Sequence, residues 1–92
     1  MKPKKRRDEE FRKEVAEHYG EGILFADDHD NAIIGVISRC GQDPFLVYDI
    51  KKVVKNFQKD GMTYDEAVEW IDFNWNAWLG TSTPGILENI EW

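Results

Sequence analysis

The clearest hydrophobic periodicity in the chain lies between Ile50 and Lys59. Apolar side chains recur there at about 100° per residue and form one stripe: Ile50, Val53, Val54 and Phe57. Lysines cover the opposite side. Asp49 is well placed to cap the N-terminus, and Asp60-Gly61 ends the segment. The pattern therefore predicts an amphipathic helix over 50–59.

A second C-terminal helix is predicted from Thr63 to Gly80. Thr63 and Glu66 match the capping box T-x-x-E, in which two hydrogen bonds close the first helical turn. Two apolar arcs adjoin on this helix: Tyr64, Ala67, Val68, Ile71, Trp75, Trp78 and Leu79, then Trp70, Phe73 and Ala77. A helix this apolar either packs on two sides or exposes a patch for a partner. Its three tryptophans are expected mainly in the core.

Two β-rich runs, Ala32–Ser38 and Phe45–Tyr48, precede these helices. The six residues between them favour a loop, so the runs are predicted to form an antiparallel hairpin. Gly35 inside the first run indicates a bulge or a close backbone approach. A short strand is also expected at Ile23–Phe25. The segment after Pro84 is expected either to add an edge strand or to lie across the helices.

The N-terminal helix is predicted over Asp8–Tyr19 and ends at Gly20. Its apolar set is small, which predicts loose docking: Phe11, Val15, Ala16 and Tyr19. Residues 1–7 are expected to be a disordered basic tail, and 8–92 a single domain. The predicted fold class is α+β, with an N-terminal helix, an antiparallel β-hairpin and two C-terminal helices packed on it.

Charge divides the chain into a basic tip and an acidic body. The first seven residues hold five of the 12 cations, and the rest carries seven cations and all 18 acids, a net charge of −11. The body should repel nucleic acid, whereas the tip could contact phosphates. Nucleic-acid contact through the tip is therefore one hypothesis, beside a merely solubilising tail. It rests on Lys4, Lys5, Arg6 and Arg7.

Bulk features favour a cytoplasmic protein. The single Cys40 cannot form an internal disulfide, which favours a reducing compartment. No apolar run approaches the ~18 residues that span a bilayer. The basic start leads into acidic residues rather than an apolar stretch, so it does not match a secretory signal. No membrane contact is expected.

The densest group of ligand-type side chains is the acidic turn from Asp27 to Asn31. Carboxylates suit hard cations, but the glycine and distant glutamate of an EF-hand are missing, and one histidine does not make a zinc site. The main interpretation is a structural turn, with no cofactor or metal. A metal-dependent enzyme or ligand site at Asp27, Asp28 and Asp30 is the alternative. The sequence shows no Ser-His-Asp order, phosphate-binding glycine loop or paired zinc cysteines.

Asn74 lies between the two apolar arcs of the last helix. A buried amide without a partner costs a few kcal/mol, so Asn74 is expected to hydrogen-bond to backbone or to a neighbouring side chain. A structural core asparagine is the favoured interpretation. A role in ligand or partner recognition, close to the acidic turn in space, is the alternative.

Several short motifs occur in a fixed order: AIIGVISR, PFLVYD, DGMTYDEAVEW, FN, AWLG and TP. In this ordered set the chain resembles a family of small proteins of tailed phages and prophages. The resemblance covers Gly22 to Pro84 and implies a phage accessory protein in the host cytoplasm, with no particular reaction. It departs from the family pattern at Asn31, where an acid is expected, and this departure weakens a metal site.

These observations favour a non-enzymatic protein that binds a host or phage macromolecule. An acidic protein can bind the basic surface of another protein and thereby inhibit it. A protein partner is expected, and pairing of two copies through the tryptophan-rich face is a further hypothesis. The candidate contacts are the anionic face of the last helix: Asp65, Glu66, Glu69 and Asp72.

Overall fold

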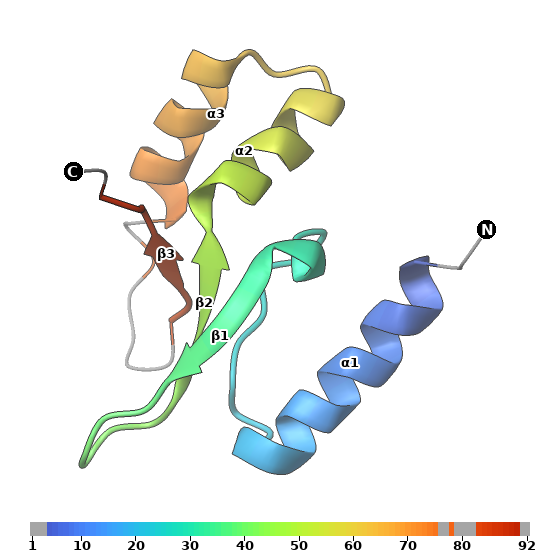
Figure 1. Ribbon diagram of the computed structural model, residues 1–92, viewed down its shortest axis with the longest axis vertical. Coiled ribbons are helices and arrows are strands. Elements are labelled where there is room, and N and C mark those ends of the chain that lie inside the picture. The colour runs from blue at the N-terminus through green and yellow to red at the C-terminus, as the bar shows by residue number, and fades with distance from the viewer. Residues whose placement is uncertain (1–3, 76–77, 79–82, 91–92) are drawn as a thin grey trace.

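A three-stranded mixed sheet lies at the centre of the fold (Figure 1). The computed structural model describes residues 4–75, 78 and 83–90. β1 (Ile33–Ile37) pairs antiparallel with β2 (Phe45–Asp49), which confirms the predicted hairpin. β3 (Gly85–Leu87) pairs parallel with β2, so the segment after Pro84 adds an edge strand. The parallel pairing follows from the helical crossover that joins β2 to β3.

α2 (Ile50–Lys59) and α3 (Tyr64–Trp70) form this crossover and begin where their caps predict. The Asp49 side chain accepts a hydrogen bond from the Lys51 N–H at 3.2 Å. The capping box is complete: the Glu66 N–H donates to Thr63 Oγ1 at 3.1 Å, and the Thr63 N–H donates to Glu66 Oε1 at 2.9 Å. Each cap satisfies amide groups that a helix end leaves open.

The third helix differs from the prediction of one α-helix up to Gly80. Regular α-helix ends at Trp70, and Ile71–Trp75 is π-helical. A π turn holds more residues than an α turn, so it changes which later side chains face the core. The predictions for residues 76–77 and 79–82 lie outside the described residues.

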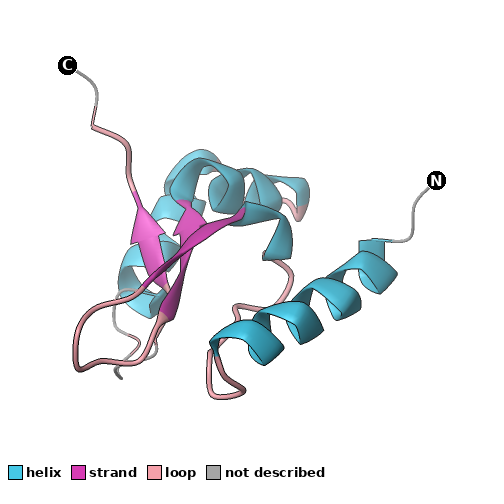
Figure 2. Cartoon of the chain, turned by 60° about the horizontal axis from the view of Figure 1, so that its bottom comes forward, coloured by secondary structure: helices cyan, strands magenta, loops and turns pink. Residues whose placement is uncertain are grey.

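α1 (Lys4–Tyr19) begins four residues before the predicted start at Asp8. Residues 4–7 of the predicted disordered tail are therefore helical, and residues 1–3 lie outside the described part. The N-terminal end of α1 points away from the sheet (Figures 1 and 2). The helix contacts the core through Val15, which is partly buried.

Two predictions for the strands had different outcomes. The predicted strand at Ile23–Phe25 is wrong, because this segment is irregular and pairs with no strand. The bulge in β1 is confirmed by a register shift between Ile33 and Gly35. A close approach is not the reason for this glycine, since a Cβ there would have no atom within 4 Å.

The core lies between the sheet and the two crossover helices. Leu46 and Tyr48 of β2 are fully buried there, as expected for alternate residues on the inner face of a strand. The Tyr48 hydroxyl accepts a hydrogen bond of 2.8 Å from the Ala26 N–H and so holds the irregular segment against the sheet. The whole cluster is Ile23, Ala26, Ala32, Leu46, Tyr48, Val53, Val54, Ala67, Ile71 and Trp75.

Burial of Tyr48 makes folding stability sensitive to alkaline pH. Desolvation raises the pKa of its phenol from the ordinary value of 10.0 to about 12, and the nearby carboxylate of Asp30 adds to the rise. The neutral phenol thus contributes stability that is complete below the unfolded pKa and lost as pH rises through the folded pKa. The free energy of unfolding should fall by on the order of 2–3 kcal/mol between about pH 10 and 12.

Urea unfolding of the wild type and of Tyr48→Phe across this range would check the prediction. The variant should be less stable at neutral pH by about 1–3 kcal/mol, because the Ala26 N–H loses its acceptor. It should also lack the part of the alkaline loss that comes from Tyr48. Equal alkaline losses in the two proteins would contradict this role for the phenol.

Candidate functional site

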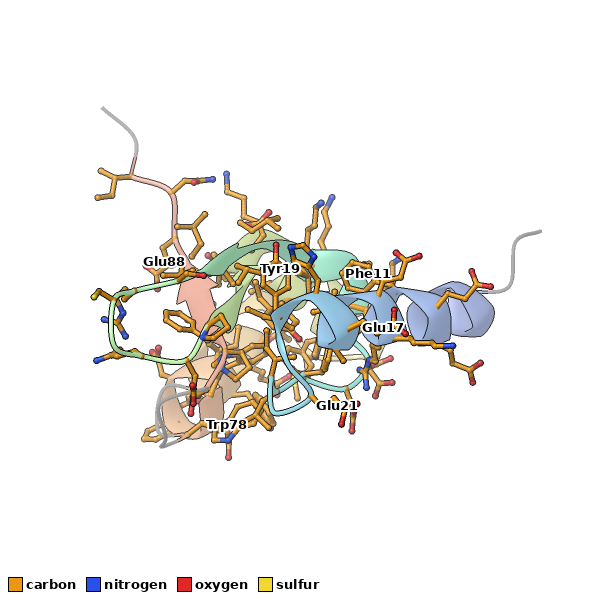
Figure 3. The ribbon with its side chains drawn as sticks, turned by 90° about the horizontal axis from the view of Figure 1, so that it is seen from below. Phe11, Glu17, Tyr19, Glu21, Trp78 and Glu88 are labelled. Carbon is orange, nitrogen blue, oxygen red and sulfur yellow. The ribbon has the colours of Figure 1, made fainter. Side chains whose placement is uncertain are left out.

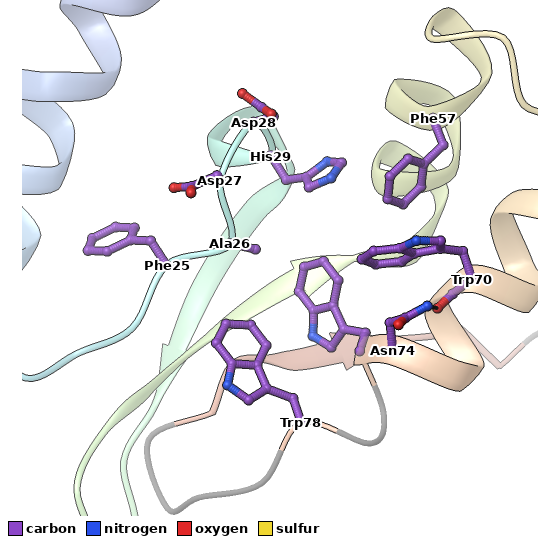
Figure 4. Close-up of a pocket in the computed structure, with 10 residues that line it drawn as sticks. Phe25, Ala26, Asp27, Asp28, His29, Phe57, Trp70, Asn74 and Trp78 are labelled. Carbon is purple, nitrogen blue, oxygen red and sulfur yellow. Dashed lines mark hydrogen bonds between the residues drawn. The ribbon is translucent and has the colours of Figure 1, made fainter.

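An open pocket of about 500 Å³ lies between the acidic turn and the C-terminal part of the third helix (Figure 4). Its polar lining is short: Asp27, Asp28, His29 and Asn74. Most of the remaining lining is aromatic, with Phe25, Phe57, Trp70, Trp75 and Trp78. Aromatic walls with a few polar groups are typical of ligand sites, and the volume lies in their usual range of ~300–1,000 Å³.

Trp75 joins this pocket to the core. Its indole is buried and packs edge-on against Tyr48, with ring centroids 5.0 Å apart. Its Nε1–H donates to the Pro84 carbonyl at 3.1 Å. Trp78 lies beside it, with a centroid distance of 6.4 Å, and reaches the surface (Figure 3).

The opposite walls come from α2 and from the acidic turn. The rings of Phe57 and Trp70 lie 5.0 Å apart, so α2 and α3 share one wall. His29 is buried edge-on against Phe57, with centroids 4.9 Å apart. Its Nδ1 lies 2.9 Å from Nδ2 of Asn56, which is an N–H donor, so Nδ1 accepts. These contacts fix the turn against α2.

A pair of amides strengthens this attachment. Asn56 Nδ2 donates to Asn31 Oδ1 at 2.9 Å, and Asn31 Nδ2 donates back to Asn56 Oδ1 at 3.2 Å. Asn31 thus has a structural role in holding the turn against α2. Asp28 is held in the left-handed region with a φ of 73°, a conformation that aspartate tolerates in turns.

Arg12 of α1 supplies the cation that the acidic turn requires. Its Nε and Nη2 donate to the two carboxylate oxygens of Asp30 at 2.8 and 2.9 Å, and the Asp30 side chain is only 3% exposed. Nη1 also reaches Asp27 Oδ1 at 3.3 Å. The guanidinium lies 4.8 Å from the centroid of the Phe25 ring. Hydrogen bonds to Asp30 raise the pKa of Arg12 above its ordinary range, so its charge persists.

This ion pair changes the interpretation of the acidic turn. Asp27 and Asp28 line the pocket, but Asp30 does not and is bound to Arg12 instead. Within residues 4–75, 78 and 83–90, no group of three or more His, Cys, Asp or Glu side chains could hold a metal ion. The sequence gives little sign of this role, because Arg12 is one of many charged residues on a helix with few apolar residues.

Asn74 is brought to the same pocket as Asp27 and Asp28, as the alternative hypothesis placed it. Its predicted burial is wrong, because the side chain is exposed. The predicted hydrogen bond to backbone is confirmed, since Nδ2 donates to the Trp70 carbonyl at 3.1 Å. The π turn is the physical reason, since it rotates this position out of the apolar arc that an α-helix would give.

The anionic face of the third helix is exposed as predicted, with Asp65, Glu66, Glu69 and Asp72 all open to solvent. The apolar excess of this helix is also exposed. Tyr64 is 62% and Phe73 72% exposed, and Trp70 is partly exposed as well. Among the described residues, the buried positions of this helix are Ala67, Ile71 and Trp75. Of the two alternatives, the structure favours the exposed patch.

The basic residues Lys4, Lys5, Arg6 and Arg7 lie in the first turns of α1. This end of the helix points away from the sheet. No helix in the described part of the chain is long and apolar enough to cross a membrane.

Comparison with protein-family models, curated proteins and solved structures finds no match.

Replacing Arg12 by Met should lower the free energy of unfolding by about 2–4 kcal/mol, because the buried carboxylate of Asp30 loses its counter-charge. Urea denaturation at neutral pH measures the loss. Lys13→Met is the matched control on the same helix, and its exposed side chain should change stability by less than about 0.5 kcal/mol. Similar losses in both variants would show that the ion pair does not hold the turn.

Millimolar Ca²⁺, Mg²⁺ or Mn²⁺ should leave the melting temperature unchanged, because Arg12 already neutralises Asp30 and contacts Asp27. Scanning fluorimetry with and without EDTA measures this. A rise with one cation that Asp28→Asn abolishes would contradict the prediction and restore the metal-site hypothesis.

Proposed function

We propose that this protein is a non-enzymatic phage accessory protein that binds a basic surface of a host or phage protein. It would act in the host cytoplasm and block or redirect its partner. The phage origin rests on the resemblance of the segment from Gly22 to Pro84 to a family of small phage proteins. The binding role rests on one observation, the exposed aromatic side chains among the acids of the third helix.

These aromatic side chains are costly to expose. Tyr64 and Phe73 present most of their surface to water without stabilising the core, and Trp70 lies between them in sequence. Large aromatic side chains are enriched at the energetic centres of protein interfaces, where charged groups form the rim. We name this surface the acidic-aromatic face: Tyr64, Asp65, Glu66, Glu69, Trp70, Asp72 and Phe73.

The charge of this face selects the class of partner. The chain after residue 7 carries a net charge of −11, which repels phosphate backbones and attracts basic protein surfaces. Complementary charge speeds association and gives specificity, while buried aromatics supply affinity. A basic protein surface therefore fits better than nucleic acid.

An enzyme at the acidic turn is the weaker hypothesis. Asp30 is held by two hydrogen bonds to Arg12, and His29 Nδ1 is held by Asn56. Groups fixed in this way stabilise the turn, whereas a general base needs a free lone pair within reach of its substrate.

Partner capture with variants of the acidic-aromatic face tests the proposal. Wild-type protein should retain a partner from bacterial lysate above an acidic control protein of matched charge. Phe73→Ala and Glu69→Lys should each reduce this retention, Phe73→Ala by about tenfold or more, as for a hot-spot residue. Higher salt should weaken capture further.

Two matched controls lie away from this face. Ile90→Ala removes another exposed apolar side chain, and Glu17→Lys makes on α1 the same charge change as Glu69→Lys. Neither should affect capture. Equal losses in the control variants would contradict the proposal. So would a wild-type dimer that Phe73→Ala dissociates, since the face would then be self-complementary.

A further inference from the structure

We propose that the pocket beside the acidic turn binds an arginine side chain of the partner. This inference rests on the proposed function and deepens it by naming the group that is recognised. The pocket adjoins the acidic-aromatic face, because Trp70 belongs to both. A partner seated on that face could therefore insert one side chain between the tryptophans and the turn.

The carboxylates that the turn exposes beside the pocket are hydrogen-bond acceptors. Asp28 is exposed and makes no ion pair within the described residues, and the Asp27 side chain is 87% exposed despite its contact with Arg12. Asn74 uses one N–H of Nδ2 on the Trp70 carbonyl, and its Oδ1 adds a further acceptor. An acceptor-rich site suits a ligand that only donates. Guanidinium has five N–H donors and no acceptor.

The aromatic walls suit the same group. A guanidinium is planar, stays charged and stacks on aromatic faces better than an ammonium ion does. Figure 4 shows the rings of Trp70 and Trp78 on one side of the pocket and the turn on the other. A planar cation between them would meet ring surfaces, while the Asp27 and Asp28 side chains extend outward from the turn at the edge of the pocket.

The protein already contains one example of this recognition. On the side facing α1, the guanidinium of Arg12 lies over the Phe25 ring at 4.8 Å and contacts Asp27 at 3.3 Å. Phe25 and Asp27 also line the pocket. Phe25 and Asp27 thus bind an internal arginine on the side that faces α1, and the same two residues also border the proposed site for an external arginine.

Competing occupants differ in charge. A nucleotide could stack on the tryptophans, but its phosphates would face Asp27 and Asp28 at the rim. A neutral apolar ligand would leave the acceptors of the rim without partners, at a cost for each one that is desolvated. Charge therefore separates arginine from both alternatives.

The test uses the full chain and N-acetyl-L-arginine methylamide as the probe, with the citrulline analogue as its neutral isostere. Tryptophan indole signals in ¹H–¹⁵N NMR spectra report the contact. Arginine should shift the Trp70 and Trp78 signals saturably, with millimolar affinity, and citrulline should bind about tenfold more weakly or not at all. The lysine analogue should fall between them.

Variants separate the pocket from the rest of the surface. Asp28→Asn should weaken arginine binding several-fold without affecting citrulline, and Trp70→Leu should weaken both. Asp43→Asn, a matched charge change in the β1–β2 loop outside the pocket lining, should leave binding unchanged. Equal binding of arginine and citrulline, preference for a nucleotide probe, or no effect of Asp28→Asn would overturn the inference.

The two proposals fail in different ways. If Phe73→Ala abolishes partner capture while Asp28→Asn does not affect it, the arginine pocket is overturned and the binding face stands. If arginine binds the pocket as described but lysate capture matches the charge control, the proposed function is overturned and the arginine site remains.

Discussion

The rest of the structure depends on the packing and hydrogen bonding of the buried Trp75 indole. Its ring packs against Tyr48 in the sheet and lies 6.0 Å from the ring of His29 in the acidic turn. Its N–H donates to the Pro84 carbonyl, directly before β3. A buried indole N–H needs an acceptor, so the π turn that places Trp75 also sets where the last strand enters the sheet. One side chain thereby joins the third helix, the sheet, the turn and the C-terminal strand.

A second constraint is the buried carboxylate of Asp30. A charge with so little exposure must be paired, and Arg12 pairs it with two short hydrogen bonds from a helix that otherwise contributes few apolar contacts. The acidic turn is consequently a rigid rim held from two sides, by α1 through Arg12 and by α2 through Asn56. Stability uses Asp30, whereas the Asp27 and Asp28 side chains stay exposed.

The third helix has a buried side, which stabilises the core, and an exposed side. Ala67, Ile71 and Trp75 face the core, whereas Tyr64 and Phe73 face water beside acidic residues. The π-helical segment lies where the pocket meets the acidic-aromatic face. Such segments often occur at functional sites, because they shift side chains out of the register that packing alone would favour.

Local patterns in the sequence determined α2, the capping box at Thr63 and the β1–β2 hairpin, because each depends on groups only a few residues apart. They also indicated that Asn74 and the acidic turn could lie together. The tertiary structure alone decided that Arg12 binds Asp30 across 18 residues, that Tyr48 holds Ala26 across 22, and that β3 pairs parallel to β2. It also decided that the apolar excess of the third helix is exposed. Periodicity records how apolar a helix is, but only the packing of distant segments decides which of its sides finds a partner within the chain.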